Sequence, residues 1–295
     1  GCRKTEESGS VKTWTVIELV EWTTKFFKSS GIPSARLDAE LLLSHALKTD
    51  RLQLYLDFDM PVFHPNLSTF RTLIKMRSSR VPISYITNSR EFMSLSFYVD
   101  ERVLIPRPET EILVETVLNL QKTPCHILEI GTGSGAIAVS LAVNQPTWKI
   151  IATDISKAAI DVAQHNTKQH QCEERITFAT GDLFEPVTKL DIPKYDWIIS
   201  NPPYIRTKDA NELTTDVRDN EPEVALFAGC SGLDIIQRLI ADTPKFLKPK
   251  GKLMLEIGHN QSRQVQDLIN SNPAYMNYNI IPDLSGIDRF ILATI

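Results

Sequence analysis

The sequence predicts an α/β fold built on a Rossmann-like sheet, preceded by a small helical domain. In the second part of the chain, short apolar runs that suit buried strands alternate with stretches of helical periodicity, which is typical of parallel sheets. A glycine-rich segment, Gly131 to Gly135, follows the first of these runs, as in sheets that bind ligands at their strand ends. The first part of the chain shows helical periodicity alone. With 295 residues, the chain is long enough for two domains.

The composition suits a globular protein without a metal site or a membrane segment. Apolar residues make up 42% and charged residues 23% of the chain, which is ordinary for globular proteins. No apolar run approaches the ~20 residues of a membrane span. The four cysteines are widely spaced and the six histidines form no ligand pattern. We therefore expect reduced thiols, no metal and no membrane contact.

The helical domain is expected over residues 13–80. Residues 1–12 are polar and lack the apolar segment of a secretory signal, so nothing argues for secretion. We expect a disordered tail, a tag remnant or the stub of a processed chain. The first helix should begin with a capping box of Thr15 and Glu18 and end at Gly31. The helices expected in this domain span 14–30, 34–47, 52–56 and 67–78. Because no constellation of reactive side chains occurs here, we expect this domain to recognise a large partner.

A connecting segment precedes the main domain. Residues 81–103 alternate apolar and polar side chains, which predicts extended strands or a hairpin linking the two domains. The main domain, 104–295, then begins with a stiff, proline-containing stretch that leads into a helix over 112–120. A proline before a helix is commonplace, so a plain helix start accounts for this stretch. Arg107 lies between two prolines and is a candidate for contact with a substrate.

Three apolar runs of the main domain end in residues suited to an adenine nucleoside. The glycine loop, 131–135, lets backbone N–H groups and a helix N-terminus approach a ligand. Asp154 after the second run can accept ribose hydroxyls. Asp182 after the third can accept the adenine amino group, and Leu183 and Phe184 can line the ring. The loop alone fits a dehydrogenase as well as a methyltransferase. Strands are expected at 126–130, 149–153, 176–179 and 197–200, with helices at 136–144 and 156–169.

The fourth strand leads into Asn201-Pro202-Pro203-Tyr204. Two prolines cannot donate to a sheet ladder, so the strand must stop at a stiff corner. The side-chain oxygen of Asn201 and the carbonyl oxygen of Pro202 can accept both N–H bonds of a planar amide or amino group, and Tyr204 offers a flat face. Such positioning can lower the barrier to alkylation of a poorly basic nitrogen by roughly 7 to 11 kcal/mol. This corner favours a methyltransferase using S-adenosylmethionine over a nicotinamide enzyme; the alternative is a polar strand exit followed by a proline turn.

Residues 205–229, after this corner, are polar and long for a plain connection, which suggests a lid. The remaining elements are expected to be a helix over 231–246, a strand over 251–258, a helix over 261–269 and closing strands over 278–281 and 289–294.

The order of these motifs resembles that of the HemK/PrmC family of protein-(glutamine-N5) methyltransferases. Members of that family modify the glutamine of the Gly-Gly-Gln motif in class 1 peptide chain release factors. The resemblance covers the chain from about Trp14 onward. It rests on the segments 104–111, 129–135, 201–204, 221–226 and 283–289.

The resemblance implies a seven-stranded S-adenosylmethionine-dependent methyltransferase fold whose last strand is antiparallel, with a helical domain that helps to bind the release factor. It implies methyl transfer from S-adenosylmethionine to the amide nitrogen of that glutamine. The cofactor-binding residues would be Glu129, Gly131, Thr132, Gly133, Ser134, Gly135, Asp154, Asp182, Leu183 and Asn201. The substrate-binding residues would be Asn201, Pro202, Pro203, Tyr204 and Arg107, with catalysis assigned to Asn201, Pro202 and Tyr204.

Two other functions remain open. An adenine-N6 nucleic-acid methyltransferase shares the Asn-Pro-Pro-Tyr motif and would flip its base into the pocket. Residues 96–295, however, carry 19 Lys and Arg against 26 Asp and Glu, a net charge of −7, so we expect no stable nucleic-acid binding. A non-catalytic adaptor could keep the fold and bind a partner, although the intact motif argues against it. The expected compartment is the cytoplasm, or the matrix of a mitochondrion or plastid after removal of a leader.

Overall fold

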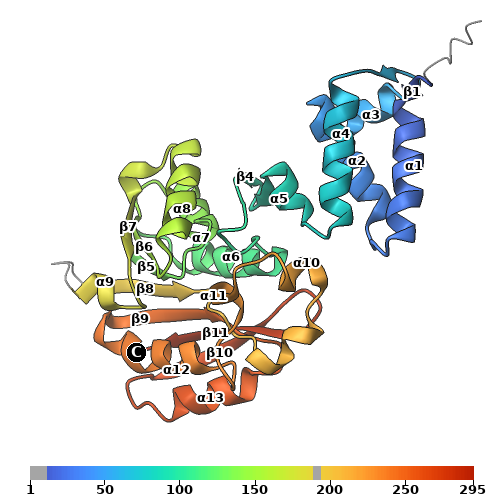
Figure 1. Cartoon of the computed structure of the whole chain (residues 1–295). Helices are drawn as coiled ribbons and strands as arrows, with labels where there is room; N and C mark the ends of the chain where they lie inside the picture. Colours follow the sequence, from blue (N-terminus) through green and yellow to red (C-terminus); the bar gives the residue numbers. More distant parts are fainter. Residues whose placement is uncertain (1–11, 189–193) are drawn as a thin grey trace, which may run out of the picture. The chain divides into compact units, whose positions relative to one another are not determined.

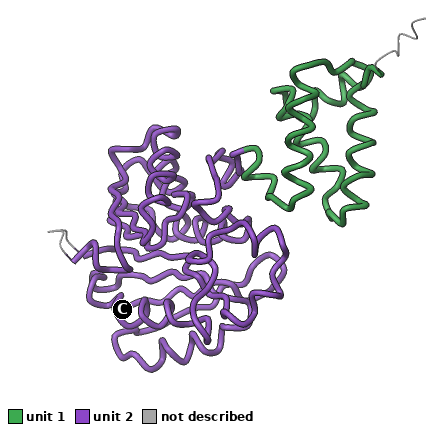
Figure 2. The backbone as a smooth tube through the Cα atoms, in the orientation of Figure 1, with its two compact units in different colours: residues 1–87 green, residues 88–295 purple. Residues whose placement is uncertain are grey.

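The computed structural model describes residues 12–188 and 194–295. The chain divides into two compact units, residues 1–87 and 88–295, which Figure 2 shows in green and purple. The predicted disordered tail, 1–12, lies outside the described residues except for Lys12. The segment predicted as a linker, 81–103, is divided between the two units.

The first unit is helical, as predicted. Thr15 caps its first helix: the backbone N–H of Glu18 donates to the Thr15 side chain and the Thr15 N–H donates to the Glu18 carboxylate, which confirms the capping box. Fully buried Phe27, Leu42 and Phe70 share its core. Its helices are α1 (Val16–Ser29), α2 (Ala35–Leu47), α3 (Arg51–Leu56), α4 (Asn66–Ser78) and α5 (Ile83–Thr87), and the short strands β1 (Trp14–Thr15) and β2 (Pro61–Val62) pair antiparallel.

Helix α5 replaces the extended structure predicted around Ile83 and Tyr85, so that prediction is wrong. The carbonyl oxygen of Pro82 accepts hydrogen bonds from the N–H groups of Tyr85 and Ile86. Proline is well suited to a first helical turn because its fixed φ matches the helix and its missing N–H is not needed there. Tyr85 and Ile86 are both buried, so a single helical turn accounts for the apolar pattern.

The second unit contains a seven-stranded sheet in the order β10-β11-β9-β8-β5-β6-β7 (Figure 1). The neighbouring strands in the series β9-β8-β5-β6-β7 are all parallel. Strand β11 runs antiparallel to both β9 and β10, which confirms the predicted fold. The strands are β5 (His126–Ile130), β6 (Lys149–Asp154), β7 (Ile176–Thr180), β8 (Tyr195–Ser200), β9 (Leu247–Glu256), β10 (Asn277–Pro282) and β11 (Asp288–Thr294).

The register of the parallel strands gathers the predicted ligand-binding residues at one edge. Ile130 at the end of β5 pairs with Thr153 on one side and with Ser200 on the other. Ser200 in turn pairs with Leu255 of β9. The residues that follow these four positions, listed in chain order, are Gly131, Asp154, Asn201 and Glu256.

Helices cover both faces of this sheet (Figure 1). One apolar core takes side chains from α6 and α7, and the other takes them from α12 and α13. The helices predicted at the start of the domain are confirmed, but the one predicted over 231–246 ends at Asp242, because Pro244 cannot continue it and a 3₁₀ turn follows. The helices are α6 (Glu111–Leu120), α7 (Ala136–Asn144), α8 (Lys157–Gln169), α9 (Glu185–Thr188), α10 (Thr215–Arg218), α11 (Glu223–Leu226), α12 (Asp234–Asp242) and α13 (Ser262–Asn270).

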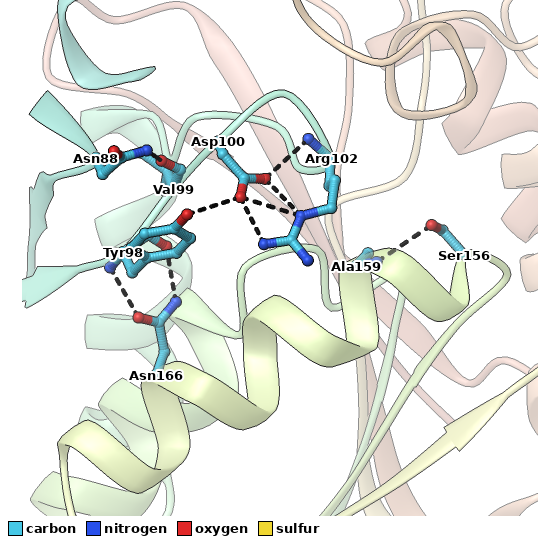
Figure 3. Close-up of polar contacts among 8 residues, drawn as sticks. All are labelled: Asn88, Tyr98, Val99, Asp100, Arg102, Ser156, Ala159 and Asn166. Atoms are coloured by element: carbon cyan, nitrogen blue, oxygen red, sulfur yellow. Dashed lines mark hydrogen bonds and ion pairs between the residues drawn. The ribbon is translucent and has the colours of Figure 1, made fainter. Parts of the chain in front are cut away.

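A β-hairpin, β3 (Arg90–Phe92) and β4 (Leu95–Phe97), belongs to the second unit. Its two phenylalanines lie in the core beneath α6 and α7. Figure 3 shows how the chain that follows is held: the buried side chain of Asn166 on α8 accepts from the Tyr98 N–H at 2.7 Å and donates to the Tyr98 carbonyl at 2.9 Å. The same amide also donates to the carbonyl of Ser134 at 2.9 Å. One side chain thus connects the hairpin to the glycine loop.

Candidate active site

The glycine loop follows β5 in a conformation that only glycine adopts readily. Gly131, Gly133 and Gly135 have φ values of 75°, 54° and 80°, in the left-handed region where a Cβ is strained. A Cβ at Gly133 would meet no atom within 4 Å, so this position faces open space. At Gly135 a Cβ would lie 3.2 Å from the Cα of Ala163, so this glycine lets α8 pack closely instead of facing a ligand.

A cleft of about 170 Å³ lies at the carboxyl edge of the sheet. Most of the residues predicted to bind cofactor or substrate line it, whereas Gly135 and Tyr204 do not. The predicted residues in its wall are Arg107, Glu129, Gly131, Thr132, Gly133, Ser134, Asp154, Asp182, Leu183, Asn201, Pro202 and Pro203.

Glu129, the fourth residue of β5, has one carboxylate oxygen engaged and one free. Its Oε2 accepts from the Thr132 hydroxyl at 2.9 Å and from the Ala138 N–H at 3.1 Å. Within the described part of the chain, no donor reaches the buried Oε1. Burial raises the pKa of Glu129 to about 8. A buried polar atom without a partner is costly, so the cleft wall is suited to a ligand that donates a hydrogen bond there.

Asp154 and Asp182 follow β6 and β7. The Asp154 carboxylate accepts from the N–H groups of Gly133 and Ser156, each at 2.9 Å, and it fixes the loop beside it. Burial raises the pKa of Asp154. Asp182 is more exposed and accepts from the Arg238 guanidinium of α12 at 2.5 Å. Leu183, with a φ of 45°, lines the cleft beside it.

The Asn-Pro-Pro-Tyr corner leaves two acceptors unused. The amide nitrogen of Asn201 donates to the Thr110 hydroxyl oxygen at 3.3 Å. Among the described residues, no donor reaches the Asn201 side-chain oxygen or the Pro202 carbonyl oxygen. Ser200 donates to the Ile130 carbonyl at 2.6 Å and ties the corner to β5. A planar group with two N–H bonds can therefore be held at this corner.

Tyr204 does not present its ring to the cleft. Its hydroxyl donates to Oε1 of Glu256 at 3.1 Å, and its ring packs against the core that contains α12. Burial raises the pKa of the Tyr204 hydroxyl. The structure thus gives this residue a supporting position beneath the corner and leaves the predicted contact with a substrate without support.

Glu256 at the end of β9 was not identified from the sequence. Only 1% of the residue is exposed, and its Oε2 accepts from the Thr110 hydroxyl at 2.6 Å. Burial raises its pKa to about 6. The available signal was an acid at the end of an apolar run, Leu253 to Ile257, at the edge where the other strands carry polar residues.

Arg107 lines the cleft, but its charge is already paired. Its guanidinium donates to Oε1 of the buried Glu221 at 2.7 Å, and Oε2 of Glu221 accepts from the Ile105 N–H at 3.2 Å. Glu221 belongs to the segment predicted as a lid, 205–229, so this segment is anchored to the proline-containing stretch. A pairing over 114 residues of sequence could not be read from either segment alone.

Arg102 lines the cleft and was also not identified from the sequence. Figure 3 shows its guanidinium directed at Asp100, with an Nη2 to Oδ2 distance of 2.5 Å. The Tyr98 hydroxyl donates to the same carboxylate at 3.0 Å. The Asp100 carboxylate raises the pKa of Arg102, so a fixed positive charge stands at the rim of the cleft.

The described residues offer neither a metal site nor a membrane-spanning helix. They contain no group of three or more side chains arranged to hold a metal ion. Within residues 12–188 and 194–295, no helix combines the length and the apolarity that crossing a membrane requires.

The chain is similar to known methyltransferases over most of its length. Two family models match, the PrmC N-terminal domain over residues 18–87 and the methyltransferase small domain over residues 108–218. A release factor glutamine methyltransferase of Rhodopirellula baltica is 39% identical over 97% of this chain and 98% of its own. One of Geobacter sulfurreducens is 39% identical over 94% and 96%. Among solved structures, the catalytic domain of hMettl16 in complex with an RNA hairpin of MAT2A superimposes with a TM-score of 0.57 at 17% identity, over 78% of this chain and 80% of that one, which shows a shared fold.

Proposed function

Since the chain belongs to the release factor glutamine methyltransferase family, we propose that it methylates the glutamine of the Gly-Gly-Gln motif in class 1 peptide chain release factors. The protein is an S-adenosylmethionine-dependent methyltransferase that acts on protein. In our proposal the methyl group goes to N5, the side-chain amide nitrogen of that glutamine. The modification would support translation termination.

The unused pair of acceptors at the Asn-Pro-Pro-Tyr corner is the observation that carries this proposal. A glutamine side chain ends in a planar amide whose nitrogen has two N–H bonds and a delocalised lone pair. The Asn201 oxygen and the Pro202 carbonyl can accept one N–H each. Both acceptors also favour the partial positive charge that grows on the nitrogen during alkylation. The corner therefore binds and orients the amide without an acid or a base.

The neighbouring residues fit S-adenosylmethionine. Open space above Gly133 admits a ligand close to the backbone, and the free Oε1 of Glu129 suits an ammonium group. We assign the ribose hydroxyls to Asp154, and the adenine to Leu183 and Asp182. When bound, S-adenosylmethionine supplies a methyl carbon activated by its sulfonium sulfur.

Recognition of the release factor would involve the first unit. On α1 of this unit, the rings of Trp22 and Phe26 stack at 5.4 Å, and 48% of Trp22 is exposed. Exposed aromatic side chains of this kind are frequent in protein interfaces. We infer that this unit contributes affinity for the folded factor and takes no part in methyl transfer.

A labelled-methyl assay tests the proposed function. We expect tritium from S-adenosylmethionine to appear on a class 1 release factor and not on the same factor with its Gly-Gly-Gln glutamine replaced by alanine. DNA and RNA offered separately should stay unlabelled. Labelling of nucleic acid in place of the factor would overturn the proposal in favour of an adenine methyltransferase.

A further inference from the structure

Asn201 stands at the end of a chain of hydrogen bonds that starts at a buried acid. Thr110, which closes a 3₁₀ turn (Pro108–Thr110), bridges Asn201 after β8 and Glu256 at the end of β9. Thr110 is 4% exposed and Glu256 is 1% exposed. The bridge lies directly behind the corner that receives the substrate amide.

The number of protons on each of these groups fixes which group donates in each hydrogen bond. The Thr110 hydroxyl has one proton, and at 2.6 Å it donates that proton to the Glu256 carboxylate, which can only accept when ionised. The Thr110 oxygen is then left as an acceptor. At 3.3 Å from it, Asn201 must present its NH₂ group, so its side-chain oxygen is directed away from Thr110.

The second oxygen of Glu256 is also engaged. It accepts from the Tyr204 hydroxyl at 3.1 Å, on the residue that completes the corner. With a donor at each oxygen, the ionised carboxylate holds Thr110 and Tyr204 in fixed roles. This gives the half-buried Tyr204 a structural purpose although its ring does not reach the cleft.

We propose that Glu256, acting through Thr110, is the positioning residue that orients the Asn201 amide so that its oxygen, and not its NH₂ group, meets the substrate glutamine. This inference rests on the proposed function, since only a substrate that offers N–H bonds needs an acceptor there. A reversed Asn201 would set two NH₂ groups against each other, and one productive hydrogen bond would be lost.

The proposal predicts a dependence on pH. The Thr110 and Tyr204 hydroxyls face Glu256. The positive charge of Arg289 lowers the pKa of Glu256, and the negative charge of Glu109 raises it. Burial outweighs the other effects and sets its pKa at about 6. Once protonated, Glu256 can donate to Thr110, whose own proton then becomes available to the Asn201 oxygen. The orienting effect is therefore present above pH 6 and is lost as the pH falls through 6.

Two substitutions of Thr110 test whether it links Glu256 to Asn201 as proposed. Valine has nearly the same shape as threonine but cannot form a hydrogen bond to Glu256 or Asn201. Thr110→Val should therefore lower kcat about 10- to 100-fold, which matches the free energy of leaving a buried polar group without a partner. It should leave the Kd for S-adenosylmethionine within about twofold, since Thr110 does not take part in the assigned cofactor contacts. Thr110→Ser keeps the hydroxyl and should recover most of kcat.

The pH profile separates positioning from a general loss of structure. At saturating S-adenosylmethionine, wild-type kcat should fall below pH 6, whereas Thr110→Val and Glu256→Gln should show low kcat without this fall. Asp196→Asn, a change of the same kind at the opposite end of β8, is the matched control and should keep the wild-type profile. Thermal melts of all variants establish that they are folded.

The outcomes distinguish this inference from the proposed function. If the wild type does not label the release factor, the proposed function itself fails, and this inference with it. If the wild type labels the factor while Thr110→Val keeps wild-type kcat and the fall near pH 6, the inference alone is overturned. Should either variant fail to fold, the wild-type profile decides: a kcat that is constant from pH 5 to 8 contradicts the role of Glu256.

Discussion

The side chain of Asn201 has its NH₂ group engaged with Thr110 and its oxygen free to meet a substrate. Among the described residues, none donates to the Pro202 carbonyl, which provides the second acceptor. Since the nucleophile is an amide nitrogen, which is a weak base, its position decides how often it reacts. Turnover should therefore depend on this one side chain more than cofactor binding does.

We expect Asn201→Ala to lower kcat by about two to three orders of magnitude, corresponding to roughly 2.7 to 4 kcal/mol for one preorganised polar group. Calorimetry should find S-adenosylmethionine still bound by this variant. Asn144→Ala, at the far end of α7, is the matched control and should keep its activity. A near-normal kcat for Asn201→Ala would remove the corner from the mechanism.

Burial of Glu129 destabilises the folded protein in the absence of ligand, and this effect should be visible in how stability depends on pH. Its pKa rises from 4.5 to about 8 on folding because burial disfavours the charged form. The folded state then binds more protons than the unfolded state between these values, so this group lowers stability progressively as the pH rises from 4.5 to 8. Glu129→Gln removes this cost.

In thermal melts, Glu129→Gln and the wild type should have similar midpoints at pH 5, and the variant should be the more stable at pH 8.5. The same variant should bind S-adenosylmethionine more weakly, because an amide cannot neutralise an ammonium group. Midpoints that differ by the same amount at both pH values would show that Glu129 is not a neutral group in the folded protein at pH 7.

At the scale of elements, the glycine loop separates into a part that faces the cleft and a part that packs. Both Gly133 and Gly135 are in the left-handed region, where alanine costs about 1 to 2 kcal/mol. Gly135→Ala adds a contact of 3.2 Å with the backbone of Ala163, whereas Gly133→Ala meets only open space. We expect Gly135→Ala to lower the melting temperature more, and Gly133→Ala to weaken S-adenosylmethionine binding more. The reverse order would mean that the two glycines have exchanged roles.

Helix α8 supports the loop through Asn166. Its fully buried amide makes three hydrogen bonds, two to Tyr98 and one to Ser134. Asn166→Ala leaves these backbone groups without partners, and we expect a loss of about 2 to 4 kcal/mol in the free energy of unfolding. Denaturant titration measures this loss. A change below about 0.5 kcal/mol would show that water replaces the amide at no cost.

At the scale of the whole molecule, the sequence predicted helices and strands that have a simple hydrophobic period, and polar residues that follow the ends of strands. Asp154 and Asn201 were predicted correctly at one edge because the carboxyl ends of parallel strands must meet there. The capping box of α1 is local, and it was predicted residue by residue.

The features that were missed depend on contacts between distant segments. Glu256, the last residue of β9, lies more than fifty residues after Asn201, and only the sheet order places the two side by side. The pairing of Arg107 with Glu221 has the same origin. Tyr204 was assigned to the substrate because a motif gives residue types but not the direction of a side chain.

The central claim is that one planar amide nitrogen is held at a proline corner for methylation. Mass spectrometry of a class 1 release factor incubated with the protein and S-adenosylmethionine tests it most directly. We predict one added methyl group, located on the Gly-Gly-Gln glutamine, with the wild type, and a rate of modification about 100- to 1,000-fold lower with Asn201→Ala. An unmodified glutamine, or a methyl group on another residue, would contradict the account.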